Sequence, residues 1–106
     1  MRRGEVWWAS MPPPWGRRPV LLLSRDEAYE FLTWVIAAPL TTRVWDVPTA
    51  VPLDPRDDGV PHRSAVSLDN IQAVRKSWLD TFMIPLRPEK MRAVDRAIHF
   101  ALGLRE

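Results

Sequence analysis

The sequence contains no cysteine, only two histidines and no long run of apolar residues. The absence of cysteine excludes disulfides, zinc sites built on thiolates and thiol catalysis, and it fits a reducing compartment. The longest apolar stretch, Trp34 to Leu40, is far too short to span a bilayer, and no long apolar segment follows the basic start of the chain. We therefore expect a cytoplasmic protein that does not enter a membrane.

Familiar catalytic and nucleotide-binding motifs are also missing. The sequence has no Walker loop, no dinucleotide fingerprint, no His-Glu-x-x-His and no Gly-x-Ser-x-Gly. His62 and His99 could act as an acid and base pair on a phosphodiester, but their predicted places in a loop and on a helix flank favour solvated side chains. No spacing of ligand residues indicates a metal site, so we expect neither a metal nor another cofactor.

Arginine and tryptophan are abundant. The net charge is only +2, yet 13 of the 15 basic residues are arginine, and six residues are tryptophan. Arginine suits planar phosphate recognition, and exposed aromatic side chains among arginines can stack unpaired bases. The alternative is that most tryptophans belong to the core, which we expect for Trp7 or Trp8, for Trp34 and for Trp78.

Strand signals follow one another along most of the chain. Pro19 to Ser24 is a nearly continuous apolar run, which predicts a central strand buried on both faces. Thr33 to Ala38 is β-branched and aromatic and is predicted to end at Pro39, whereas internal prolines mark Val47 to Leu53 as an edge strand. The remaining predicted strands are Glu5 to Ala9, Ser64 to Leu68, Asn70 to Val74 and Thr81 to Leu86.

Turn residues and one helical pattern complete the prediction. Asp54 to Pro61 is predicted to be an exposed loop, in which Asp57 and Asp58 are solvated. A helix is predicted to begin at Pro88, because apolar residues follow at helical spacing and Gly103 suits the position after the helix.

These elements predict a single domain over residues 1–106, of the α+β class and mostly β. Short antiparallel strands with corners marked by proline are typical of a small barrel or a strongly bent sheet, with the terminal helix packed on it. A hydrophobic content of 46% is enough to bury a modest core in a chain of 106 residues.

Two arginines stand directly before the predicted central strand, in Gly16-Arg17-Arg18-Pro19. A guanidinium stays charged and presents planar donors, so this position suits a phosphate or carboxylate; a solvated surface pair is the alternative. RNA carries its own nucleophile, the 2′-hydroxyl, so one arginine and one hydroxyl can supply much of what a ribonuclease needs. Arg18 and Thr41 are the candidates, although Thr41-Thr42 also suits an ordinary turn.

Three segments resemble the MazF/PemK family of toxin endoribonucleases, and the resemblance extends through nearly the whole chain. The segments are Met1 to Trp8, Gly16 to Ser24 and Ala38 to Arg43. The resemblance implies the SH3-like barrel fold of CcdB, MazF and PemK toxins. It also implies catalytic roles for Arg18 and Thr41, with Thr42 as the other candidate for the hydroxyl.

The resemblance implies a sequence-selective, metal-independent endoribonuclease that acts as the toxin of a type II toxin–antitoxin system. Attack by the 2′-hydroxyl of single-stranded RNA would leave a 2′,3′-cyclic phosphate and a 5′-hydroxyl. It further implies a homodimer with an RNA groove shared by two protomers. A cognate antitoxin would place a flexible acidic and apolar tail in that groove.

Six further residues are predicted to bind RNA: Trp15, Arg17, Thr42, Arg43, Asp69 and Asn70. Trp15 follows three prolines and either stacks a base or plugs the barrel mouth. Asp69-Asn70 resembles the acid and amide segment of the family, where glutamine is more frequent than asparagine and where some members carry a basic residue at the position of Ser67. Asp69 either orients Arg18 or a hydroxyl, or is ordinary turn material.

Two alternatives belong to other functional classes. A toxin of the same fold could poison DNA gyrase without catalysis, but that activity in the CcdB group depends on an aromatic residue near the C-terminus, and this chain ends Leu102-Gly103-Leu104-Arg105-Glu106. A barrel that binds RNA or peptide without catalysis would result if Arg18 and Thr41 did not converge.

Overall fold

The computed structural model describes residues 1–43 and 45–104. Residue 44, within the loop after the third predicted strand, and residues 105 and 106 of the C-terminal tail lie outside the described residues. The strands are β1 (Glu5–Ser10), β2 (Arg17–Leu22), β3 (Trp34–Thr41), β4 (Ala50–Leu53), β5 (Ser64–Ser67), β6 (Gln72–Arg75) and β7 (Leu79–Pro85). The helices are α1 (Ala28–Phe31), α2 (Pro55–Asp58) and α3 (Pro88–Ala101), with 3-10 turns η1 (Leu68–Asn70) and η2 (Lys76–Trp78).

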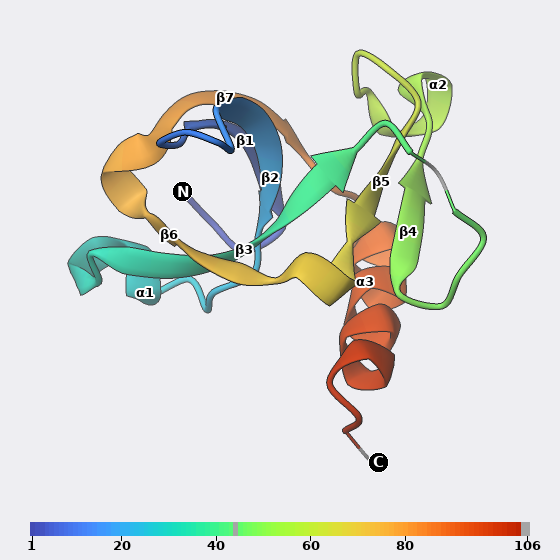
Figure 1. Cartoon of the computed structure of the whole chain (residues 1–106). Coiled ribbons are helices and arrows are strands. Elements are labelled where there is room, and N and C mark those ends of the chain that lie inside the picture. The colour runs from blue at the N-terminus through green and yellow to red at the C-terminus, as the bar shows by residue number, and fades with distance from the viewer. Residues whose placement is uncertain (44, 105–106) are drawn as a thin grey trace.

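All strand pairs are antiparallel and form one strongly bent sheet. Its order is β4-β5-β3-β2-β1-β7, and β6 also pairs with β3. Figure 1 shows β1, β2, β3, β6 and β7 curving around a common interior, whereas β4, β5 and α3 stand together at one side. This arrangement confirms the predicted class, a mostly β barrel with a C-terminal helix.

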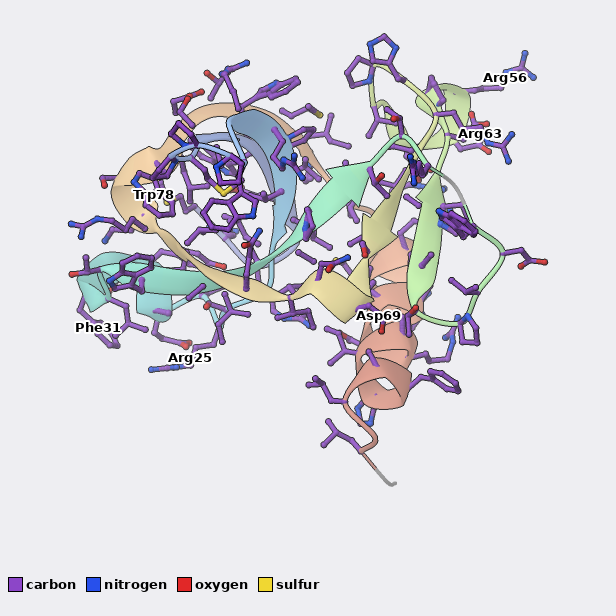
Figure 2. All side chains as sticks on the ribbon, in the orientation of Figure 1. Arg25, Phe31, Arg56, Arg63, Asp69 and Trp78 are labelled. Carbon is purple, nitrogen blue, oxygen red and sulfur yellow. The ribbon has the colours of Figure 1, made fainter. Side chains whose placement is uncertain are left out.

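The central strand β2 is buried on both faces, as its apolar run predicts. Val20 and Leu22 belong to one hydrophobic cluster, and Leu21 belongs to another. The first cluster fills the barrel interior, and the second lies between the sheet and α3. Side chains alternate along a strand, so a run of apolar residues is needed to serve two cores. Figure 2 shows the side chains that fill the barrel interior.

The third strand is longer than the sequence predicts. β3 continues through Pro39 to Thr41, although a proline cannot donate to a ladder. Ala37 is the last residue of β3 that pairs with β6, and Leu40 is the first that pairs with β5. Pro39 therefore lies where β3 exchanges one neighbour for another, so its missing N–H removes no ladder bond on that side.

The tryptophans divide between core and surface. Trp7 and Trp78 pack against the barrel core, as predicted. The core prediction is wrong for Trp34, which is 47% exposed and makes an edge-to-face contact with Trp78 at a centroid distance of 5.4 Å. Trp34 begins β3 on the side of the strand opposite the buried Val35, so alternation directs its ring outwards.

The predicted loop from Asp54 to Pro61 contains the single helical turn α2. Asp54 caps it by accepting hydrogen bonds from the backbone N–H of Arg56 at 2.7 Å and of Asp57 at 3.3 Å. Gly59, at φ 78°, ends the turn in the left-handed region that favours glycine. A capping aspartate before Pro55 is a helix-start signal, so the sequence carried the information.

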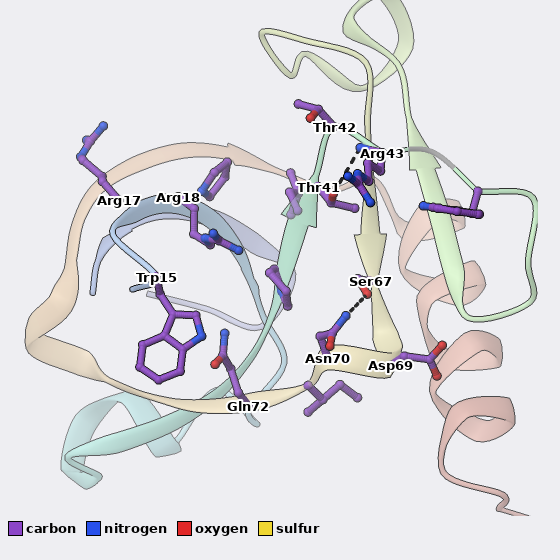
Figure 3. Close-up of a pocket in the computed structure, with 15 residues that line it drawn as sticks. Trp15, Arg17, Arg18, Thr41, Thr42, Arg43, Ser67, Asp69, Asn70 and Gln72 are labelled. Carbon is purple, nitrogen blue, oxygen red and sulfur yellow. Dashed lines mark hydrogen bonds between the residues drawn. The ribbon is translucent and has the colours of Figure 1, made fainter. Parts of the chain in front are cut away.

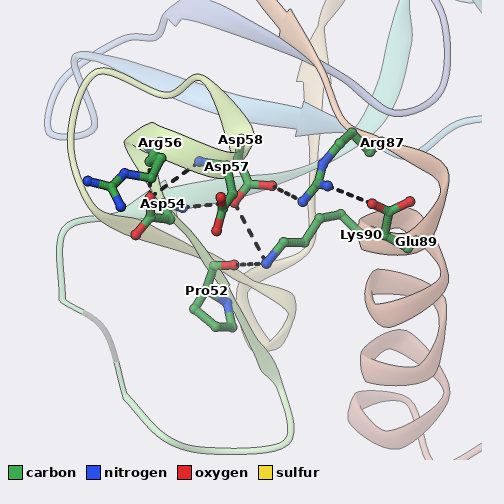
Figure 4. Close-up of polar contacts among 8 residues, drawn as sticks. All are labelled: Pro52, Asp54, Arg56, Asp57, Asp58, Arg87, Glu89 and Lys90. Atoms are coloured by element: carbon green, nitrogen blue, oxygen red, sulfur yellow. Dashed lines mark hydrogen bonds and ion pairs between the residues drawn. The ribbon is translucent and has the colours of Figure 1, made fainter.

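The prediction that Asp58 is solvated is wrong. Its side chain is fully buried and accepts a hydrogen bond from the backbone N–H of Asp54 at 2.8 Å. Its carboxylate lies 3.3 Å from a guanidinium nitrogen of Arg87 and 3.7 Å from Nζ of Lys90 (Figure 4). Lys90 also donates to the carbonyl oxygen of Pro52 at 2.8 Å. This polar cluster joins α2 and β4 to the start of α3.

The C-terminal helix follows its predicted pattern. It begins at Pro88 and buries Val94 and Ala97 against the sheet, and Gly103 at φ 67° follows it. Within residues 1–43 and 45–104, no helix combines the length and the apolarity needed to cross a membrane.

Replacing Asp58 with asparagine is expected to destabilise the fold by on the order of 2 to 4 kcal/mol, because two cations lose a buried anionic partner. The exposed neighbour provides a matched control, since Asp57→Asn should change stability by less than about 0.5 kcal/mol. Urea unfolding of both variants measures the difference. Equal stabilities would show that the buried cluster contributes nothing.

Candidate active site

The site lies where β2 and β3 separate. The two strands pair from Leu22 and Ala37 to Val20 and Pro39, and the ladder stops there. Two further residues in the same register would place Arg18 opposite Thr41. The ladder does not reach that pair. Thr41 pairs with Ala65 of β5 along the opposite edge of β3, and the ends of β2 and β3 line a pocket (Figure 3).

The pocket has a volume of about 850 Å³. It brings together all the predicted catalytic and RNA-binding residues, which come from the loop before β2, the start of β2, the end of β3, the loop after β3 and η1. They are Trp15, Arg17, Arg18, Thr41, Thr42, Arg43, Asp69 and Asn70. Their convergence is a structural fact, whereas their roles in binding and catalysis stay predictions.

Arg18 contributes a cation that lacks an anionic partner within the described part of the chain. Its side chain is partly buried, and its Nε atom is buried without any hydrogen-bond partner. No carboxylate of residues 1–43 or 45–104 forms an ion pair with it. A partly buried guanidinium in this state is a strong site for an external anion, because the charge remains to be neutralised and the donors remain to be used.

Arg17 has the opposite environment. Its guanidinium bonds to both carboxylate oxygens of Asp80, at 2.9 and 3.3 Å, and lies 4.5 Å from the ring centroid of Trp8. Ser10 and Thr81 also donate hydroxyl hydrogen bonds to Asp80, at 2.5 and 2.7 Å. The hydrogen bonds from Arg17, followed by those from Ser10 and Thr81, lower the pKa of Asp80 well below its usual range.

Thr41 offers an oriented hydroxyl. Its Oγ1 accepts a hydrogen bond from the backbone N–H of Arg43 at 3.2 Å (Figure 3). The hydroxyl hydrogen is left to donate to a ligand, and the Arg43 guanidinium has no carboxylate partner among the residues described. Thr42 is exposed on the pocket rim next to Thr41.

Asp69 and Asn70 lie in η1, the turn that joins β5 to β6 beneath the pocket. Asp69 forms no hydrogen bond with Arg18 or with Thr41 in the described structure. Its Oδ2 accepts a hydrogen bond from the hydroxyl of Thr49 at 2.6 Å. The carboxylate therefore orients the chain before β4. Asn70 donates from Nδ2 to Oγ of Ser67 at 2.7 Å, which leaves its amide oxygen to accept from a ligand.

The loop between β1 and β2 presents Trp15 at the pocket mouth. The loop is closed by hydrogen bonds from the N–H of Met11 to the carbonyl of Gly16 and from the N–H of Trp15 to the carbonyl of Pro12. Met11 is buried in the barrel core, whereas Trp15 is 51% exposed. Met11 therefore belongs to the barrel core, and the Trp15 ring is accessible for stacking.

The sequence prediction missed some residues of the pocket. Trp45 is 61% exposed on the lining, and Gln72 adds an amide from the start of β6. Trp45 could have been found, because it follows Arg43 in the same mixture of basic and aromatic residues that singled out Trp15. No local pattern marks Gln72, which reaches the pocket only because β6 pairs with β3.

No metal centre emerges from the geometry. Over the ranges 1–43 and 45–104, no three side chains among His, Asp and Glu gather as a metal site would require. The pocket residue with a carboxylate, Asp69, is already bonded to Thr49. The chemistry available at the pocket is thus that of guanidinium, hydroxyl, amide and indole groups.

Comparisons with known proteins agree with this geometry. Residues 2–102 match the family described as PemK-like, MazF-like toxin of type II toxin–antitoxin system. A probable endoribonuclease of Mycobacterium tuberculosis, MazF5, is 41% identical over 100 residues, which are 94% of this chain and 91% of the relative.

Solved structures give the same result. The Mycobacterium tuberculosis toxin MazF-mt6 superposes with a TM-score of 0.86 at 32% identity, over 96% of this chain and 99% of that one. A mycobacterial endoribonuclease in complex with its cognate antitoxin has a TM-score of 0.88 at 28% identity, over 100% and 98% of the two chains. The chain therefore belongs to the PemK-like, MazF-like toxins of type II toxin–antitoxin systems, among which its named relatives are endoribonucleases.

Proposed function

We propose that this toxin is a sequence-selective endoribonuclease that cleaves single-stranded RNA without a metal, by attack of the substrate's own 2′-hydroxyl. One observation carries the proposal: the unpaired guanidinium of Arg18 and the oriented hydroxyl of Thr41 line one pocket, at the ends of β2 and β3. An RNA phosphate is an anion that both groups can bind at once.

In the proposed reaction, the 2′-oxygen attacks the adjacent phosphorus and the bond from phosphorus to the 5′-oxygen breaks. The 2′-hydroxyl loses its proton and the departing 5′-oxygen gains one, so the products are a 2′,3′-cyclic phosphate and a 5′-hydroxyl. Negative charge grows on the phosphoryl oxygens during attack. Arg18 stabilises that charge and Thr41 donates a hydrogen bond to the same oxygens, while the pocket holds the strand in line.

The remaining pocket residues would bind the strand on either side of the cut. Arg43 adds a second unbalanced cation for a neighbouring phosphate, and the exposed indoles of Trp15 and Trp45 are suited to stack bases. The amides of Asn70 and Gln72 can read base edges, because each amide presents both donors and an acceptor.

The same proposal includes partners and location. The mycobacterial relative whose structure is described as an endoribonuclease in complex with its cognate antitoxin supports an antitoxin partner for this chain. We expect a homodimer that shares its RNA groove, acting in the cytoplasm where its substrate would be. Gyrase poisoning and binding without catalysis are not favoured, since the named relatives are endoribonucleases.

Arg18→Ala is expected to reduce cleavage at least about 100-fold, because it removes the cation that stabilises the transition state. Arg17→Ala should keep cleavage within about tenfold, since the charge of Arg17 is already balanced by Asp80. Rates measured on a fluorescent RNA, with thermal unfolding as a check of the fold, compare the two variants. A larger loss in Arg17→Ala than in Arg18→Ala would assign the reaction to the other guanidinium.

Cleavage is expected to continue unchanged in excess EDTA, because the nucleophile belongs to the substrate and the charge is stabilised by Arg18. The measurement is the cleavage rate in EDTA with and without added Mg²⁺. Loss of activity in EDTA that magnesium restores would establish a metal-assisted mechanism in place of this one.

A single 2′-deoxy substitution on the 5′ side of the scissile phosphate is expected to abolish cutting while binding changes by less than about threefold, because phosphates and stacked bases supply most of the affinity. The same substitution two nucleotides away serves as the control and should be cut normally. Rapid cleavage of the first substrate would mean that water or a protein group attacks the phosphorus.

A further inference from the structure

A second, smaller pocket adjoins the active site. It has a volume of about 130 Å³, and residues of β2 and of the end of β3 form part of its wall. Four residues, Pro19, Leu40, Thr41 and Thr42, line both pockets. A group bound in the smaller pocket therefore lies against the same strand end that supplies Thr41 to the larger one.

Most of the wall is apolar and includes one indole. Trp8, Val60 and Met83 enclose the space together with Pro61. The guanidinium of Arg17 lies over the Trp8 ring, 4.5 Å from the ring centroid. Arg17 in turn donates two hydrogen bonds to Asp80, which fix the guanidinium in place. A rigid aromatic wall in a narrow apolar space is suited to a flat ring.

One polar group in this wall lacks a partner. Ser64, at the start of β5, is only 6% exposed, and its Oγ is buried without a hydrogen bond to any residue of the described chain. Buried polar atoms are nearly always satisfied, and leaving a hydroxyl unpaired costs free energy. Ser64 is thus a group whose partner is missing from the chain itself, in a pocket that opens beside the reacting groups.

We propose that the smaller pocket binds one unpaired nucleobase of the RNA, directly beside the scissile phosphate, and that the Ser64 hydroxyl reads its edge. The proposal rests on the proposed ribonuclease function and adds a specificity site to it. The base would stack on Trp8, and a donor or acceptor on its edge would satisfy Ser64 Oγ. Bases that present no matching group at that point would leave the hydroxyl unpaired and bind more weakly.

The test compares Ser64→Ala with wild type on an RNA pool randomised around the cut, by sequencing the new 5′ ends. The expected result is that base preference falls by about tenfold or more at one position adjacent to the cut, with preferences elsewhere unchanged. Without RNA, the melting temperature of Ser64→Ala should equal or exceed that of wild type, because the variant removes an unsatisfied buried hydroxyl. Ser77→Ala removes an exposed hydroxyl of η2 and is the matched control.

Unchanged base preferences in an active Ser64→Ala protein would overturn the proposal, and so would an equal loss of preference at every position. A marked drop in melting temperature would also overturn it, since it would show that the hydroxyl is already satisfied. Weaker binding of an antitoxin peptide with unchanged RNA preferences would assign the pocket to a protein side chain instead. Failure of the ribonuclease proposal would appear separately, as wild-type protein that does not cleave or as full activity of Arg18→Ala.

Discussion

The arrangement of the site depends on one feature of the sheet: the ladder between β2 and β3 ends at Val20 and Pro39, while β3 continues and pairs with β5 along its other edge. Pro39 occupies the position at which the neighbour on one side changes from β6 to β5. Beyond Pro39, Thr41 pairs with β5 and Arg18 pairs with β1, but the two residues do not pair with each other. The ends of β2 and β3 therefore form walls of the larger pocket. Residues of the same two strands also line the smaller pocket.

The two neighbouring arginines show how a strand separates identical charges. Because side chains alternate, Arg17 and Arg18 leave β2 on opposite sides. Arg17 meets Asp80 and the Trp8 ring and has its charge balanced, whereas Arg18 shares the side of Val20 and has no carboxylate within reach. Arg18 therefore lacks a carboxylate partner because of its position in the strand pairing, and not because of the amino-acid composition of the chain.

The sequence predicted the barrel, the central strand and the terminal helix, because apolar runs and proline positions are local signals. It also indicated which residues converge at the site, although that information came from resemblance to a family and not from spacing alone. The sequence prediction failed where contacts with residues distant in sequence determine the burial or the position of a side chain. The burial of Asp58 depends on Arg87 and Lys90, which lie 29 and 32 residues further along the chain, and the position of Gln72 depends on the pairing of β6 with β3.

The polar cluster of Asp58, Arg87 and Lys90 has a consequence for which residues of the small pocket can be substituted. It fixes the segment that supplies Val60 and Pro61 to the small pocket, and it does so from α2 and α3, away from both pockets. The anchoring residues and the wall residues are therefore different residues. Val60 and Pro61 can therefore be substituted without removing the contacts of Asp58 with Arg87 and Lys90 that fix their segment.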